Sequence, residues 1–237
     1  MGHSSDWDEI RESIRERLPD CETCAVDLEP ASNWDNSVRQ LADKVPPRSV
    51  LIGYSMGARL SLALVLNHPG RYAGLVFVSG NPGIESKEAR RDRWRADQEL
   101  AAQIESIRDA ESIAPFLQRW YQQAVFASVP EIVRQSEVRR KQANWSDRWP
   151  AILRANSISR QPNYWSQLPD IAIPVWVVAG QDDEKYRRIA VRWLENKMDS
   201  PVDTRIVPGS GHLVHRERPD ALSQIIQECI DNLPTMD

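Results

Sequence analysis

The chain has 237 residues, of which 41% are hydrophobic and 27% charged, and its formal net charge is −4. This length suits one α/β domain with a well-buried core. Without a basic excess we expect no nucleic-acid surface, and without an apolar window of ~20 residues we expect no membrane span. A cytoplasmic enzyme or binding protein is expected.

Short apolar runs alternate with amphipathic stretches along most of the sequence. Runs that are apolar throughout, without polar alternation, are typical of strands buried on both faces of a parallel sheet. Alternating strands and helices predict a doubly wound, mostly parallel α/β sheet. In chain order, we expect a helix at 8–18, a strand at 24–28, a helix at 35–45, a strand at 49–53, a helix at 56–67, strands at 75–78 and 175–178, a helix at 187–198, a strand at 204–207 and a helix at 219–233.

The three cysteines give little support for metal or redox chemistry. Cys21 and Cys24 form a CxxC pair, but no second ligand pair follows, and Cys24 opens a strand-like run. Cys229 falls in the last predicted helix. We therefore expect reduced thiols and no metal.

Residues 85–168 break the alternation and resemble several proline-punctuated helices, which predicts a helical cap inserted in a core formed by 1–84 and 169–237. The cap has 14 Lys and Arg against 11 Asp and Glu, so it carries +3 and the core −7. This places positive charge over whatever the cap covers. Solvated, arginine-rich helix faces are the alternative.

The segment Gly53-Tyr54-Ser55-Met56-Gly57 joins a predicted strand to a predicted helix. A sharp reversal there forces the apical serine into a strained backbone conformation, and small neighbours relieve the crowding. The Ser55 hydroxyl then projects above the carboxyl end of the sheet. The amide of Met56 lies at the helix N-terminus, where it can stabilise an oxyanion.

A serine needs a histidine to take its proton and a carboxylate to orient that histidine. The loop after the strand at 204–207 contains His212 and His215, and the loop after 175–178 contains Asp182 and Asp183. Of the four histidines, His212 is the preferred base and His215 the second choice, a candidate to line the pocket. The residues alone leave Asp182 and Asp183 as alternatives for the carboxylate.

Five stretches of the chain resemble the α/β-hydrolase superfamily and, within it, the 2-succinyl-6-hydroxy-2,4-cyclohexadiene-1-carboxylate synthases of menaquinone biosynthesis. The arginine four residues after the serine and the cap sequence Trp-Tyr-Gln-Gln are more specific than the glycine-flanked serine. The five stretches are 53–59, 81–83, 120–126, 180–186 and 211–217.

The resemblance implies an α/β-hydrolase fold and a catalytic triad of Ser55, Asp183 and His212. It implies a cofactor-free lyase that removes the proton α to a succinyl ketone, whereupon pyruvate leaves. The substrate that the resemblance implies is a small polycarboxylate, and arginine forks bind carboxylates. The implied binding residues are Tyr54, Arg59, Arg93, Trp120 and Arg140; an ungapped comparison from Trp120 reaches Lys141 instead of Arg140.

The chain departs from the family at its start. The family begins with a strand, then His-Gly and an apolar residue whose amide completes the oxyanion hole, then a loop and a tryptophan; residues 1–8 resemble only the loop and tryptophan. We therefore expect a fold that lacks its N-terminal strands. We also expect Met1 to be an internal methionine of a longer natural protein, which the upstream reading frame tests.

Two other functions are consistent with the same residues. A serine esterase or carbon–carbon hydrolase would use the triad to form an acyl-enzyme. A non-catalytic binding protein of the same fold is the third hypothesis, motivated by the missing half of the oxyanion hole.

Overall fold

The computed structural model describes residues 2–196 and 201–233; Met1 and the expected helix end at Met198 lie outside these ranges. The strands are β1 (Val50–Tyr54), β2 (Gly74–Val78), β3 (Val175–Gly180) and β4 (Val202–Val207). The helices of the core are η1 (Ser4–Trp7), α1 (Asp8–Arg17), α2 (Trp34–Lys44), α3 (Met56–Asn67), α8 (Glu184–Glu195), α9 (Val214–Glu217) and α10 (Pro219–Asp231). Between β2 and β3 lie α4 (Lys87–Glu105), α5 (Ala114–Trp120), η2 (Ala124–Phe126), α6 (Glu131–Ala143), α7 (Trp149–Ala155) and η3 (Trp165–Asp170).

The four described strands form one sheet in the order β1-β2-β3-β4, and every neighbouring pair is parallel. The doubly wound parallel architecture is therefore confirmed. The carboxyl ends of parallel strands share one edge of the sheet, so the loops after β1, β3 and β4 converge there. No helix in the described part of the chain is long and apolar enough to cross a membrane.

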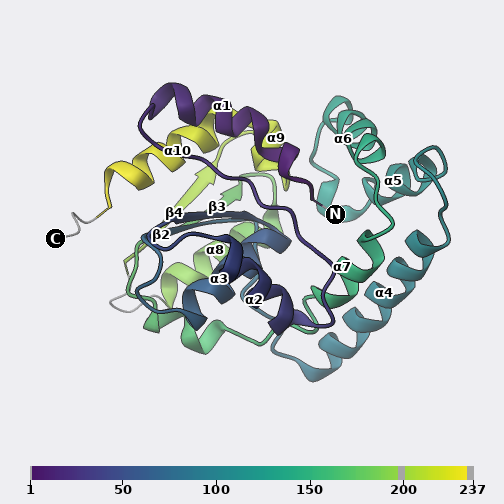
Figure 1. The fold of residues 1–237 in the computed structure, drawn as a ribbon, viewed down its shortest axis with the longest axis horizontal. Helices are drawn as coiled ribbons and strands as arrows, with labels where there is room; N and C mark the ends of the chain where they lie inside the picture. Colours follow the sequence, from purple (N-terminus) through teal and green to yellow (C-terminus); the bar gives the residue numbers. More distant parts are fainter. Residues whose placement is uncertain (1, 197–200, 234–237) are drawn as a thin grey trace.

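Successive side chains of β2 point to opposite faces of the sheet and enter two different cores. Leu75 and Phe77 pack with residues of α2, α3 and α8, whereas Val76 and Val78 pack with residues of α1 and α10. Figure 1 shows these helices covering the two faces, with α4 to α7 gathered beside the core. Burial on both faces explains why the strand reads as a continuous apolar run.

The predicted strand at 24–28 is wrong. This segment has no regular secondary structure, and no strand among the described residues lies beside it. Instead, Asp27 accepts hydrogen bonds from the Ser4 amide (2.6 Å) and hydroxyl (2.9 Å), while Leu28 packs against the core. A β-strand exists only where a neighbour accepts its backbone bonds.

Candidate active site

Ser55 stands at the apex of the turn between β1 and α3 with φ 50° and ψ −105°. This is a region that L-residues avoid, as the sequence predicted for this turn. The Ser55 amide donates to the Val78 carbonyl (2.9 Å), which ties the turn to β2. The turn therefore holds the serine at the carboxyl edge of the sheet.

The two glycines beside Ser55 differ in what they do. A Cβ at Gly53 would lie 2.6 Å from the backbone of Ala58, so only glycine fits there. A Cβ at Gly57 would meet nothing within 4 Å. The crowding that small neighbours were expected to relieve is therefore found at Gly53 and not at Gly57.

Asp183 and His212 come from the loops after β3 and β4 and meet in the interior. Asp183 Oδ2 and His212 Nδ1 are 2.7 Å apart, and the residues are 5% and 4% exposed. Asp183 Oδ1 also accepts from the Tyr186 amide (3.3 Å), which fixes the carboxylate at the start of α8. Asp182 is exposed. Of the two alternatives, it is Asp183 that pairs with the histidine, and it leaves Nε2 as the basic atom.

Three aromatic rings surround the His212 ring. Their centroids lie 4.6 Å away for Tyr186, 5.3 Å for Tyr54 and 5.7 Å for Phe126. Tyr54 immediately precedes Ser55, so the serine and the imidazole lie in the same region. Among the described residues, no hydrogen bond joins the Ser55 hydroxyl to His212. Such contacts commonly tighten only when substrate binds.

Trp120 lies on the cap side of this aromatic group. Its ring centroid is 6.3 Å from that of Phe126, whose ring packs edge-on against His212. A second contact, also at 6.3 Å, joins Trp120 to Phe116 within α5. The segment between β2 and β3 thus reaches the histidine through aromatic contacts.

Arg59 lies one turn into α3 from Ser55 and is 7% exposed. Its guanidinium donates to Gln161 Oε1 (3.0 Å) and to the Asn156 carbonyl (2.8 Å), and it lies 5.5 Å from the Trp34 ring centroid. Within the described part of the chain it makes no ion pair. Burial lowers the pKa of Arg59 to about 10, because the charged form loses its hydration.

Arg93 adds a second cation on the same side. Its Nε donates to Asp97 Oδ1 (2.9 Å), and the buried Asp97 also accepts from the Ser157 hydroxyl (2.6 Å). After burial, the charge of Arg93 is the next influence that lowers the pKa of Arg59. Asp97 pairs with Arg93 and affects Arg59 only through its charge, so two guanidinium groups share this one carboxylate, and a positive surplus is left for an anion.

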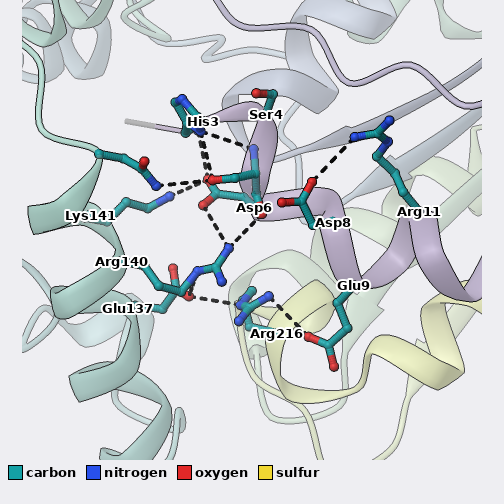
Figure 2. A network of polar contacts seen from close by, with 12 residues as sticks. His3, Ser4, Asp6, Asp8, Glu9, Arg11, Glu137, Arg140, Lys141 and Arg216 are labelled. Carbon is teal, nitrogen blue, oxygen red and sulfur yellow. Dashed lines mark hydrogen bonds and ion pairs between the residues drawn. The ribbon is translucent and has the colours of Figure 1, made fainter.

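Arg140 is not brought together with these cations. Its Nη2 donates to the Ser5 carbonyl (2.8 Å), and ion pairs of 3.8 Å and 3.5 Å join it to Asp6 and Glu137. The neighbouring Lys141 is buried and pairs with Asp6. Figure 2 shows Arg140 and Lys141 turned toward the N-terminal segment.

Comparison with known proteins decides the family. The profile of the alpha/beta hydrolase family matches residues 2–225. The chain belongs to this family. A relative from Enterobacter sp. (strain 638) is named 2-succinyl-6-hydroxy-2,4-cyclohexadiene-1-carboxylate synthase. It is 27% identical over an alignment of 249 positions, which covers 98% of this chain and 91% of that protein.

Solved structures agree with the family resemblance. MenH from S. aureus superposes with a TM-score of 0.74 at 25% identity, covering 89% of this chain and 79% of that one. A thermophilic esterase from Thermogutta terrifontis has a TM-score of 0.66 at 20% identity, covering 94% and 84%. The second likeness shows the fold alone.

His215 holds a more definite place in this alpha/beta hydrolase than its sequence position revealed. It is 3% exposed and lies between the rings of Trp7 and Tyr54, at centroid distances of 5.6 Å and 4.3 Å. Its Nδ1 is buried with no hydrogen-bond partner among the described residues. Burial lowers the pKa of His215 to about 3, so the ring is neutral.

Sequence reasoning missed Gln161, which binds Arg59 from a position 102 residues further along the chain. The only local signal is a glutamine before Pro162, and that dipeptide occurs widely in loops. Its significance follows from the buried arginine that it contacts.

Proposed function

We propose that this protein is a lyase of menaquinone biosynthesis that eliminates pyruvate from 2-succinyl-5-enolpyruvyl-6-hydroxy-3-cyclohexene-1-carboxylate. The observation that carries the proposal is Arg59, a buried guanidinium one helical turn from Ser55 whose hydrogen-bond acceptors are both neutral. A buried cation without an anion is costly. A substrate carboxylate would supply the missing charge, and the names of the relatives point to such a substrate.

The chemistry requires a base, an oxyanion site and no cofactor. In the proposed reaction, His212 accepts the Ser55 proton through Nε2 while Asp183 stabilises the resulting imidazolium. The serine oxygen removes the proton α to the succinyl ketone. The electron pair of that C–H bond passes through the enolate and forms a double bond between ring carbons 2 and 3. The existing double bond then shifts from carbons 3 and 4 to carbons 4 and 5, and the C–O bond from carbon 5 to the enolpyruvyl group breaks. Pyruvate is released after the departing enolate regains a proton from the site.

One feature of the turn suits this step. The enolate that develops on the ketone oxygen needs a fixed hydrogen-bond donor, and the Met56 amide opens α3 before any intrahelical acceptor is available to it. We assign substrate binding to Arg59, Arg93, Trp120 and Tyr54. Arg140 is left out because its guanidinium is occupied by Ser5 and by the acidic side chains around it.

A coupled assay for pyruvate tests the proposal. The purified protein should release pyruvate from the precursor, and Ser55→Ala should reduce kcat by roughly a hundredfold or more, as expected for loss of the group that moves the proton. A matched control is Ser210→Ala, since Ser210 is buried in the neighbouring loop. Absence of pyruvate release by the unaltered protein would contradict the proposal.

A serine esterase or carbon–carbon hydrolase is the second candidate, favoured by the strained Ser55 and the formed Asp183–His212 pair. The strained serine and the Asp183–His212 pair suit the formation of an acyl-enzyme as well as they suit proton removal. Rapid hydrolysis of short aryl esters and stoichiometric labelling by a serine reagent, without pyruvate release, would support it. If Ser55→Ala leaves the cellular function unchanged, the non-catalytic binding protein is supported instead.

A further inference from the structure

The hydrogen bonds of Gln161 determine which way its side-chain amide points. The residue is fully buried, and its Nε2 donates to the carbonyls of Pro82 (2.7 Å) and Asn81 (3.2 Å). Both acceptors belong to the loop after β2. Because a carbonyl can only accept, the nitrogen must face this loop and Oε1 must face the other way.

That fixed oxygen is one of the two hydrogen-bond acceptors of Arg59. Gln161 Oε1 accepts from Arg59 Nη1 (3.0 Å), and the Asn156 carbonyl accepts from Nη2 (2.8 Å). The Arg59 fork is therefore oriented from the cap side by oxygens without net charge. A neutral acceptor holds a guanidinium in place and leaves its charge available to another group.

The nearby protein carboxylate does not take that charge. Asp97 contributes electrostatically to the pKa of Arg59, but its two oxygens are bound by Arg93 (2.9 Å) and by the Ser157 hydroxyl (2.6 Å). A glutamate at position 161 would have nearly the shape of glutamine and would form a buried ion pair with Arg59. It would also place an oxygen against the two carbonyls of the β2 loop.

We propose that Gln161 is a positioning residue that orients Arg59 while leaving its charge uncompensated, so that the site accepts a carboxylate of the substrate. This inference rests on the proposed function for the identity of the substrate. A neutral acceptor that leaves the charge of Arg59 uncompensated should favour the binding of an anion. Anion binding can be measured apart from catalysis. We favour a carboxylate as the anion because a planar guanidinium can donate two parallel hydrogen bonds to the two carboxylate oxygens.

The experiment compares Gln161→Glu, Gln161→Ala and the matched control Gln135→Glu, whose exposed side chain bonds Glu131 on α6. Gln161→Glu should raise KM for the precursor roughly tenfold or more, with a smaller change in kcat, because binding of the carboxylate is lost. Gln161→Ala should raise KM less, since the charge remains while its orientation is lost. The control should behave as the unaltered protein.

A double-mutant cycle separates positioning from a purely structural role. If Gln161 acts through Arg59, the Gln161→Glu change should have little further effect on KM in an Arg59→Met background. If the effects of the two substitutions on KM multiply in the double variant, the inference is overturned. An unchanged KM in the Gln161→Glu protein would also overturn it. Thermal melts show whether Gln161→Glu folds; if it does not, the Gln161→Ala cycle carries the test.

Calorimetric titration with succinate keeps this result distinct from failure of the proposed function. Saturable binding by the unaltered protein, weakened roughly tenfold or more by Gln161→Glu, supports the inference even if no pyruvate is released. Lack of saturable succinate binding by the unaltered protein, or equal binding by the variant, overturns it.

Discussion

Replacing Arg59 by methionine tests the charge that the proposed site depends on. Methionine keeps much of the volume of the side chain but removes the guanidinium, whose two described hydrogen bonds are 3.0 Å and 2.8 Å long. If Arg59 binds a substrate carboxylate, loss of that charge-assisted contact costs about 2 to 4 kcal/mol. At 1.36 kcal/mol per tenfold change, kcat/KM for pyruvate release should fall by about 30- to 900-fold.

The same substitution should have a small effect on stability. It leaves the Gln161 oxygen and the Asn156 carbonyl without a donor, at about 1 to 3 kcal/mol for each buried group, but it also removes a buried charge that is unfavourable by itself. These contributions oppose each other, so we expect the free energy of unfolding in urea to change by less than about 3 kcal/mol. A functional loss of 30-fold or more would then reflect the site and not misfolding.

Arg154→Met provides the control for this experiment. Arg154 pairs with Glu105 at 2.6 Å, with side-chain exposures of 31% and 60%, so its loss should change kcat/KM negligibly and stability by under about 0.5 kcal/mol. An Arg59→Met enzyme within threefold of the unaltered kcat/KM would refute the assignment. An equal loss in both variants would show that the assay reports general damage.

Three further predictions concern the framework of the site. Asp6→Asn should lower the free energy of unfolding in urea by about 3 to 5 kcal/mol, because the buried Lys141 loses its anion. Gly53→Ala should abolish folding or activity, since its Cβ would lie 2.6 Å from backbone atoms, whereas Gly57→Ala should fold normally, as shown by thermal melts. The pKa of His215 is lowered from 6.5 to about 3 by burial, so below pH 6.5 the unfolded chain binds a proton that the folded protein excludes. Stability should therefore fall by up to about 1.4 kcal/mol per pH unit from pH 6.5 toward 3, and His215→Phe should reduce this slope.

Asp8→Asn removes an exposed carboxylate of the same segment, and the buried-pair argument is wrong if it destabilises as much as Asp6→Asn. Equal melting temperatures for the two glycine variants would contradict the steric difference at the turn. An unchanged pH slope in urea denaturation of His215→Phe would show that other groups cause the acid sensitivity.

The network around Asp6 shows why contacts to the cap resist prediction from sequence. Figure 2 shows the N-terminal segment facing Glu137, Arg140 and Lys141 of α6, with Arg216 on the core side. Glu137 accepts from Arg216 Nε (3.0 Å), and Lys141 lies 135 residues from its partner Asp6. The family resemblance assigned a cation near position 140 to the substrate. Only the fold reveals that both cations there already have acidic partners.

Elements with a local sequence pattern could be predicted without the structure. The runs that became β2 and β3 are apolar because both faces of the sheet are covered there, and the strand–serine–helix pattern fixed the reversal at Ser55. The family resemblance had implied Asp183 as the partner of His212, although the residues alone left Asp182 open. Only the tertiary structure decided that the run at 24–28 has no neighbouring strand and that Gln161 meets Arg59. The physical reason is that local residues set backbone geometry and side-chain periodicity, whereas a hydrogen bond or an ion pair also requires a partner that only long-range packing brings into reach.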